Sequence, residues 1–184
     1  MFEDYTALFK EIAEKLDVEP VKVEYCHVKA GGRARGNRIW ASCEAVAVHE
    51  YVHVLQFSKY TPTIFSLTKS LIKSFFKTIF SRKSVNLVKA FQEGFAEYVT
   101  TDVLGYSENP LLSKAREKAS KAGRIGFATA SYNSYVYGLE YYRVIEKAFG
   151  RRKAVETGFT SPEKFREVAE QAAKIVGAKL PDLV

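Results

Sequence analysis

The sequence predicts a mostly helical α+β domain with a small sheet near its N-terminus. The 184 residues fit one domain of ordinary size, so residues 1–184 are taken as a single unit. Apolar residues make up 47% of the chain and charged residues 27%, which is typical of a globular protein and not of a disordered one. Apolar residues recur at helical spacing along most of the chain, whereas the alternation typical of strands occurs only before residue 43.

The N-terminal part contains one predicted helix and two predicted strands. Residues 4–16 carry an apolar stripe at helical spacing. Residues 21–25 alternate apolar and polar side chains, the period of a half-buried strand, and residues 39–42 predict a second short strand. The glycines within 30–37 predict a loop or a hairpin between these strands.

The remainder of the chain is predicted to be helical. Residues 44–57 are apolar nearly all round, which indicates a buried helix. Ser161 followed by Pro162 predicts the start of the last helix, with serine as its cap and proline in its first turn. Four more helices are predicted between these two, at 62–82, 84–104, 111–122 and 132–149, and Gly150 ends the last of them.

The buried helix carries His49, Glu50 and His53 in the pattern HExxH. Residues four apart on a helix lie on one face about 5–6 Å apart, so both imidazoles can reach one metal ion. Burying even one neutral polar group without a partner costs roughly 2–7 kcal/mol, and a metal ion would relieve that cost for all three side chains. We therefore expect one Zn²⁺ per chain, with His49 and His53 as ligands. Glu50 is placed to accept a proton from a water molecule that the metal activates.

A third zinc ligand is predicted in the segment Phe91-Gln92-Glu93-Gly94-Phe95-Ala96-Glu97-Tyr98. Glu93 and Glu97 lie one turn apart in an otherwise apolar helix, an arrangement that a nearby cation would stabilise. The division that we expect is that Glu93 binds the metal and Glu97 accepts a hydrogen bond from a ligating imidazole. Gly94 is expected to let this helix approach the HExxH helix closely.

These two motifs, HEYVH and EGFAEY, resemble those of the gluzincins, the zinc metallopeptidases whose third ligand is a glutamate. The chain is most similar to compact peptidase-MA-like families and locally to zinc aminopeptidases with an NEGFA segment. The resemblance implies a zincin-like fold with His49, His53 and Glu93 as ligands, Glu50 as general base and Glu97 as the acid that supports an imidazole.

The resemblance extends to a tyrosine-rich helix but not to every feature of those families. Tyr135 begins a YxxG pattern, and related families place a tyrosine there whose hydroxyl contacts the oxyanion. Thirty-nine residues separate His53 from Glu93, more than in thermolysin-like relatives. The GxMEN segment that holds a substrate amine in aminopeptidases is absent, so the resemblance implies a peptidase without implying an aminopeptidase.

The long connection between the zinc motifs forms a predicted amphipathic helix at 62–82. It has a wide apolar stripe, and Lys69, Lys73 and Lys77 lie on the opposite side. Three interpretations remain open: an ordinary surface helix, a lid over the active site, or a helix that contacts an anionic membrane surface. The lysines oppose a membrane span, because each would cost about 2.5–3.5 kcal/mol near the bilayer centre.

The net charge of +7 and the pI near 9.3 are compatible with an anionic partner. The clusters formed by Arg33, Arg35 and Arg38 and by 151–153 lack interleaved aromatic residues, so no specific nucleic-acid partner is expected. The N-terminus lacks the features of a secretory signal, and we expect a cytoplasmic protein.

The chemistry of these residues predicts a zinc-dependent hydrolase, a metallopeptidase acting on peptide or protein substrates. The strand at 39–42 precedes the zinc helix and is expected to pair with an extended substrate. Two alternatives remain: a zinc-holding binding or regulatory module without catalysis, and a membrane-surface binder that acts through 62–82.

Overall fold

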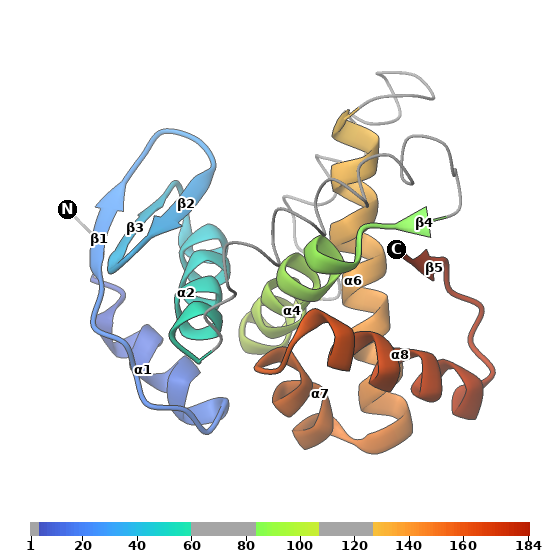
Figure 1. Ribbon diagram of the computed structural model, residues 1–184. Helices are drawn as coiled ribbons and strands as arrows, with labels where there is room; N and C mark the ends of the chain where they lie inside the picture. The colour runs from blue at the N-terminus through green and yellow to red at the C-terminus, as the bar shows by residue number, and fades with distance from the viewer. Residues whose placement is uncertain (1–3, 60–83, 107–126) are drawn as a thin grey trace.

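The computed structural model describes residues 4–59, 84–106 and 127–184, and these form two lobes that meet along two helices. The N-terminal lobe comprises α1 (Thr6–Lys15), β1 (Glu24–His27), β2 (Gly32–Arg35), β3 (Arg38–Ala41) and α2 (Glu44–Lys59). The C-terminal lobe comprises β4 (Ser84–Val85), α4 (Leu87–Leu104), α6 (Phe127–Phe149), α7 (Arg151–Gly158), α8 (Pro162–Val176) and β5 (Asp182–Leu183). Figure 1 shows the lobes side by side, with α2 and α4 along their boundary. The described chain is thus mostly helical with a small sheet, as predicted.

The small sheet has the order β1-β3-β2, in which β1 is parallel and β2 antiparallel to β3. Residues 21–25 alternate half-buried and exposed side chains, as predicted. Strand pairing begins only at Glu24, because its partner Arg38 is the first residue of β3. Before β1, the main-chain N–H of Val21 donates to the Tyr51 hydroxyl and not to a carbonyl group of a neighbouring strand. The segment 30–37 proves to be a hairpin that contains β2.

One face of the sheet packs on the helices of the N-terminal lobe. Ile39 and Ala41 are fully buried on this face, while Trp40 between them points to the other side and is half-buried. The predicted helix 4–16 is confirmed as α1, and its Phe9 stacks on Tyr51 of α2 with ring centroids 4.3 Å apart. Helix α2 is buried nearly all round, also as predicted.

Local capping explains where the predicted helices of the C-terminal lobe begin and end. The predicted helix 84–104 starts later, at Leu87, because the Asn86 side chain accepts from the N–H of Lys89. Gly105, in the left-handed region with φ 67°, ends it. The predicted cap of α8 is confirmed, since Ser161 Oγ accepts from the N–H of Lys164. The sequence did not reveal α7 or the parallel pairing of β4 with β5.

Helices α4 and α6 cross at two glycines. A Cβ atom placed on Gly94 would lie 2.4 Å from the carbonyl carbon of Gly138, and one placed on Gly138 would lie 2.6 Å from the carbonyl oxygen of Ala90. Contacts this short leave no room for any side chain. The prediction that Gly94 serves the approach to the HExxH helix was wrong, because Gly94 faces α6 and not α2.

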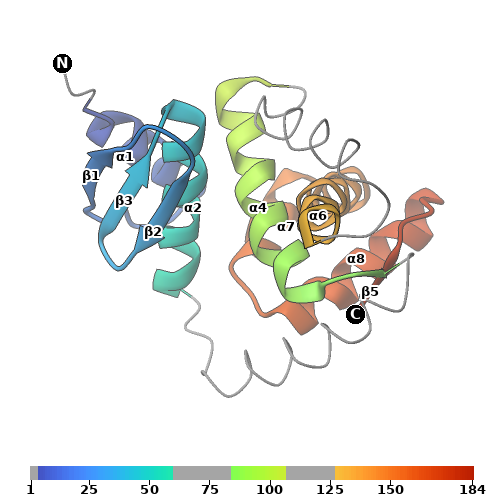
Figure 2. The ribbon, with the colours of Figure 1, turned by 90° about the horizontal axis from the view of Figure 1, so that it is seen from above.

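The lobes are joined by apolar packing and by polar contacts. One hydrophobic core includes side chains from both lobes. Gln56 Nε2 of α2 donates to the carbonyl of Gly158 in α7 at 2.9 Å. Arg151, also in α7, donates to the carbonyl of Lys15 in α1 and forms an ion pair with Asp102 of α4. These contacts fix the spacing of α2 and α4, which lie side by side when seen from above (Figure 2).

Two predicted helices, at 62–82 and 111–122, lie outside the described residues. Within 4–59, 84–106 and 127–184, none of the helices combines the length and the apolar character that a membrane span needs.

Candidate metal centre

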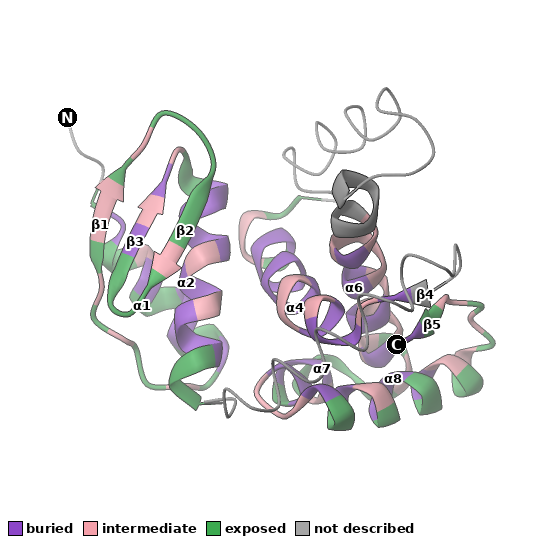
Figure 3. Ribbon diagram, turned by 45° about the horizontal axis from the view of Figure 1, so that its top comes forward, coloured by how far each residue is buried: buried purple, intermediate pink, exposed green. Residues whose placement is uncertain are grey.

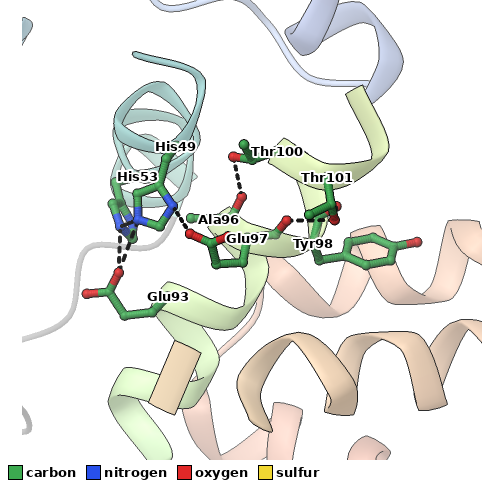
Figure 4. A network of polar contacts seen from close by, with 8 residues as sticks. All are labelled: His49, His53, Glu93, Ala96, Glu97, Tyr98, Thr100 and Thr101. Carbon is green, nitrogen blue, oxygen red and sulfur yellow. Dashed lines mark hydrogen bonds and ion pairs between the residues drawn. The ribbon is translucent and has the colours of Figure 1, made fainter. Parts of the chain in front are cut away.

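The predicted site residues of α2 and α4 face one another across the lobe boundary (Figure 4). His49 and His53 are one turn apart on α2, and both imidazoles point toward α4. Glu93 and Glu97 are one turn apart on α4 and point toward α2. His49 and Glu97 are buried, with 8% and 3% of their surfaces exposed. Tertiary packing therefore brings together two motifs that the sequence keeps far apart.

Three donor atoms converge on one point. His49 Nε2 and His53 Nε2 lie 3.1 Å apart, and Glu93 Oε2 lies 3.2 Å from the first and 3.3 Å from the second. The three atoms lie within hydrogen-bond distance of one another, and when both imidazoles are neutral with Nε2 unprotonated, all three direct a lone pair at the same point. The group can hold a metal ion.

The donor set and its spacing fit zinc. Two imidazoles and one carboxylate form a common protein ligand set in catalytic zinc sites. Ligands about 2.0–2.1 Å from a tetrahedral zinc ion lie about 3.3–3.4 Å from one another. The donor separations of 3.1, 3.2 and 3.3 Å are close to that spacing. No rearrangement of the two helices would be needed to bind the ion.

Glu97 contacts the other side of the His49 ring. Its Oε1 lies 2.9 Å from His49 Nδ1, within hydrogen-bond distance. A proton shared at Nδ1 leaves the lone pair of Nε2 directed at the convergent point. The two glutamates thus take the positions that were predicted for them, Glu93 among the donors and Glu97 behind one imidazole.

The charges of the site favour a cation at its centre. Burial alone would lower the pKa of His49, but hydrogen bonds to Glu93 and Glu97 outweigh burial and raise the pKa to about 10. Burial would raise the pKa of Glu93, yet its hydrogen bonds to His49 and His53 hold that pKa well below its usual value. Both shifts have the same cause, the attraction between the carboxylates and positive charge on the imidazoles that they contact.

Glu50 lies beside the donor group without belonging to it. It is half-buried, and burial raises the pKa of its carboxyl group, while the neighbouring histidines and the main-chain N–H of Ala34 act in the opposite direction. Strand β2 packs directly on this part of α2: a Cβ atom on Gly32 would lie 2.2 Å from Val46 Cγ1 and 3.2 Å from Glu50 Cγ. The contact with β2 was not predicted, because the glycines of this segment indicated only a loop or a hairpin.

Tyr135 reaches the site from α6. Its ring stacks on His49 with centroids 5.9 Å apart and an interplanar angle of 24°. Burial raises the pKa of its hydroxyl, and the charge of Glu93 and a hydrogen bond to that carboxylate raise it further. Tyr135 precedes Gly138 by one turn, so the close crossing of α4 and α6 sets its position. The part that its hydroxyl would take in a reaction stays a prediction.

The sheet order overturns the expectation that residues 39–42 pair with a substrate. Residues 39–41 belong to β3, the central strand, whose two edges are occupied by β1 and β2. Among the described strands, β2 is the edge strand next to α2, and no other described strand pairs with its outer side.

The candidate centre therefore combines a donor group for one metal ion, a separate carboxylate, a tyrosine hydroxyl and the edge of a sheet. These come from α2, α4, α6 and β2. Comparisons of the chain with protein-family models, with curated proteins and with solved structures found no match.

Proposed function

We propose that this protein is a zinc-dependent peptidase whose metal is held by His49, His53 and Glu93. The observation that carries the proposal is the convergence of their donor atoms at 3.1–3.3 Å, the spacing of ligands around one zinc ion. Zinc supplies Lewis acidity, which brings the pKa of a water molecule near 7 and polarises a carbonyl group.

Glu50 is the proposed general base. Its carboxylate lies next to the donor group but contributes no donor to it, so it remains available to accept a proton from water. The N–H of Ala34 orients the carboxylate. After bond cleavage the same carboxyl group would give its proton to the leaving amine. A site that only stored zinc would need the three ligands and would have no use for Glu50.

Tyr135 is the proposed donor to the oxyanion that forms when water adds to the scissile carbonyl. A tyrosine hydroxyl is protonated at neutral pH, and the raised pKa of Tyr135 extends that state to higher pH, so the hydroxyl can donate a hydrogen bond there. Its ring is held against His49, which fixes the hydroxyl beside the donor group.

The edge of β2 is the proposed substrate platform. Ser42 N–H donates to the carbonyl of Gly31 in the hairpin ladder. Alternate residues of an antiparallel strand direct their main-chain groups to opposite sides, so Gly32 and Ala34 direct theirs away from β3. The contact of the Ala34 N–H with Glu50 agrees with this direction. An extended peptide pairing with this edge would pass Glu50 and the metal.

The proposal is tested by metal analysis together with a peptide-library cleavage assay. We expect one zinc per chain in the parent protein and none bound tightly after His49→Ala or His53→Ala. Glu50→Gln should keep the zinc and lose hydrolysis, because an amide cannot accept the proton. Glu44→Gln, an exposed change in the first turn of the same helix, is the matched control and should keep both.

Three results would contradict the proposal. Stoichiometric zinc in both histidine variants would show that these histidines are not the metal ligands. Full activity of Glu50→Gln would show that Glu50 is not the general base. Bound zinc with no cleavage of any library member would indicate a zinc-holding module without catalysis.

A further inference from the structure

The face of the small sheet opposite α1 and α2 carries charged side chains in two rows across the strands. Because side chains alternate along a strand, the residues that point away from the buried Ile39 share this face. In Figure 3 the strands lie in front of α1 and α2, with this face toward the viewer. The register aligns one row in the order Arg33, Trp40 and Cys26, and a second row in the order Arg35, Arg38 and Glu24.

The charges of this face are balanced between β1 and β3 and unbalanced on β2. Arg38 of β3 forms an ion pair with Glu24 of β1. Arg33 and Arg35 of β2 are exposed, and neither forms an ion pair with a carboxylate of the described residues. The guanidinium of Arg33 lies over the Trp40 ring, 4.6 Å from its centroid, which orients it across the sheet. Two positive charges without an ion pair among the described residues thus lie two residues apart on β2, whose outer side pairs with no other described strand.

We propose that β2 selects extended peptides that carry acidic side chains at two alternate positions, one facing Arg33 and the other facing Arg35. This inference rests on the proposed function for the cleavage that follows binding, but the recognition itself does not require cleavage. A peptide strand added to an edge places its side chains about 4.5–5.5 Å from those directly opposite. Side chains at alternate positions of the peptide would therefore share the face of the two arginines.

The geometry favours a peptide over a single-stranded nucleic acid. The chain has one tryptophan, and one face of its ring is already covered by Arg33, so it offers little room for a base to stack. The main-chain groups of Gly32 and Ala34 point outward at the repeat of a peptide strand, and among them the Ala34 N–H also donates to Glu50. Phosphodiesters offer acceptors but no donors, so they cannot pair with the outward carbonyl groups of the strand.

Binding is measured first, with the zinc-loaded Glu50→Gln protein so that the peptides stay intact. The probes are fluorescently labelled peptides that differ only at two alternate positions, Glu-x-Glu against Gln-x-Gln, with the pair moved along the peptide. We expect about two- to fivefold tighter binding for each glutamate in the best register. The preference should shrink in high salt, because both arginines are exposed. The fluorescence of Trp40 should change on binding, since the ring lies next to the edge strand.

Variants test whether the two arginines cause the preference. Arg33→Gln with Arg35→Gln should bind both peptides alike, and Arg33→Glu with Arg35→Glu should favour a Lys-x-Lys peptide. Arg152→Gln with Lys164→Gln removes the same net charge from exposed positions of α7 and α8 and should keep the preference for glutamate. Zinc content and melting temperature establish that each variant is folded.

The inference is overturned if the glutamine variant keeps the full preference for acidic peptides. It is also overturned if a single-stranded oligonucleotide binds through Arg33 and Arg35 while acidic peptides do not. If the parent protein cleaves acidic and neutral peptides at equal rates, the proposed selection of acidic peptides is wrong and the proposed hydrolysis is supported. If Glu-x-Glu peptides bind through the two arginines but the parent protein does not cleave them, the selection is supported and the proposed hydrolysis is wrong.

Discussion

Glu93 and Glu97 are chemically identical and one helical turn apart, yet they contact opposite nitrogens of the same imidazole. Glu93 faces the Nε2 atom of His49, where the three donors converge, and Glu97 faces its Nδ1 atom. The first position belongs to a direct ligand and the second to a group that orients a ligand. The two carboxylates should therefore differ in what their loss does to metal affinity.

We expect Glu93→Ala to weaken zinc binding more than Glu97→Ala does. Loss of a group that supports a ligand costs about 10–100-fold in metal affinity, whereas loss of Glu93 removes a bond to the ion. Competition with a chromophoric chelator measures both affinities, and Glu140→Ala, a half-exposed glutamate on α6, serves as the control. The reverse order would mean that Glu97 is the ligand.

Tyr135→Phe should keep the zinc and slow the reaction. The phenyl ring preserves the stacking on His49, while the donor to the oxyanion is lost. Removal of one such donor costs about 10²–10³-fold in kcat. Steady-state kinetics should show the loss in kcat with little change in KM, and Tyr137→Phe on the same helix is the control. An unchanged kcat would exclude Tyr135 from the reaction.

At the scale of elements, the glycine contact between α4 and α6 positions two site residues at once. Gly94 follows Glu93 directly, and Gly138 lies one turn after Tyr135. Any side chain at the crossing would push α4 and α6 apart and change the positions of Glu93 and Tyr135 relative to each other. A packing feature without polar groups thus determines the geometry of a polar site.

We expect Gly138→Ala to lower both the stability and the zinc affinity. Its Cβ would meet main-chain atoms of α4 that cannot rotate away, and overpacking of this kind costs about 1–3 kcal/mol or more. Gly105→Ala is the matched control: nothing lies within 4 Å of its Cβ, and its φ of 67° costs about 1 kcal/mol of stability without affecting the metal. Urea unfolding and chelator competition measure the two effects. Equal zinc affinity in the Gly138→Ala protein would mean that the crossing does not set the site.

On the scale of the whole molecule, the proposed metal would join the two lobes. His49 and His53 belong to the N-terminal lobe and Glu93 to the C-terminal lobe. The other polar links described above, from Gln56 and Arg151, lie away from the donor group and involve α7. The ion would therefore strengthen the lobe boundary where α2 faces α4.

Removal of the metal by a chelator should lower the melting temperature, and added zinc should restore it. An ion present at about a thousand times its Kd stabilises the folded state by about 4 kcal/mol. Hydrogen exchange should localise the loss of protection to α2 and α4. The His53→Ala protein is the control, since its melting temperature should not respond to the chelator. A parent protein that melts at the same temperature with and without metal would contradict the bridging role.

Much of the secondary structure and the composition of the candidate site follow from local sequence. The buried character of α2 is evident from its apolar flanks, and the cap of α8 from Ser161 and Pro162. His49, His53 and Glu93 were predicted as a group from residue type and helical spacing, which fix the face of a helix on which a side chain lies.

Tertiary structure alone decided which faces meet. Periodicity shows that Gly94 lies on a buried face but not that its partner is Gly138, 44 residues later. Nor does alternation give the order of strands, so the sequence could not show that β3 is central and β2 is the edge beside Glu50. These features depend on contacts between segments that are distant in the chain. The free energy of such contacts comes from side-chain packing and strand pairing, which a local sequence pattern does not predict.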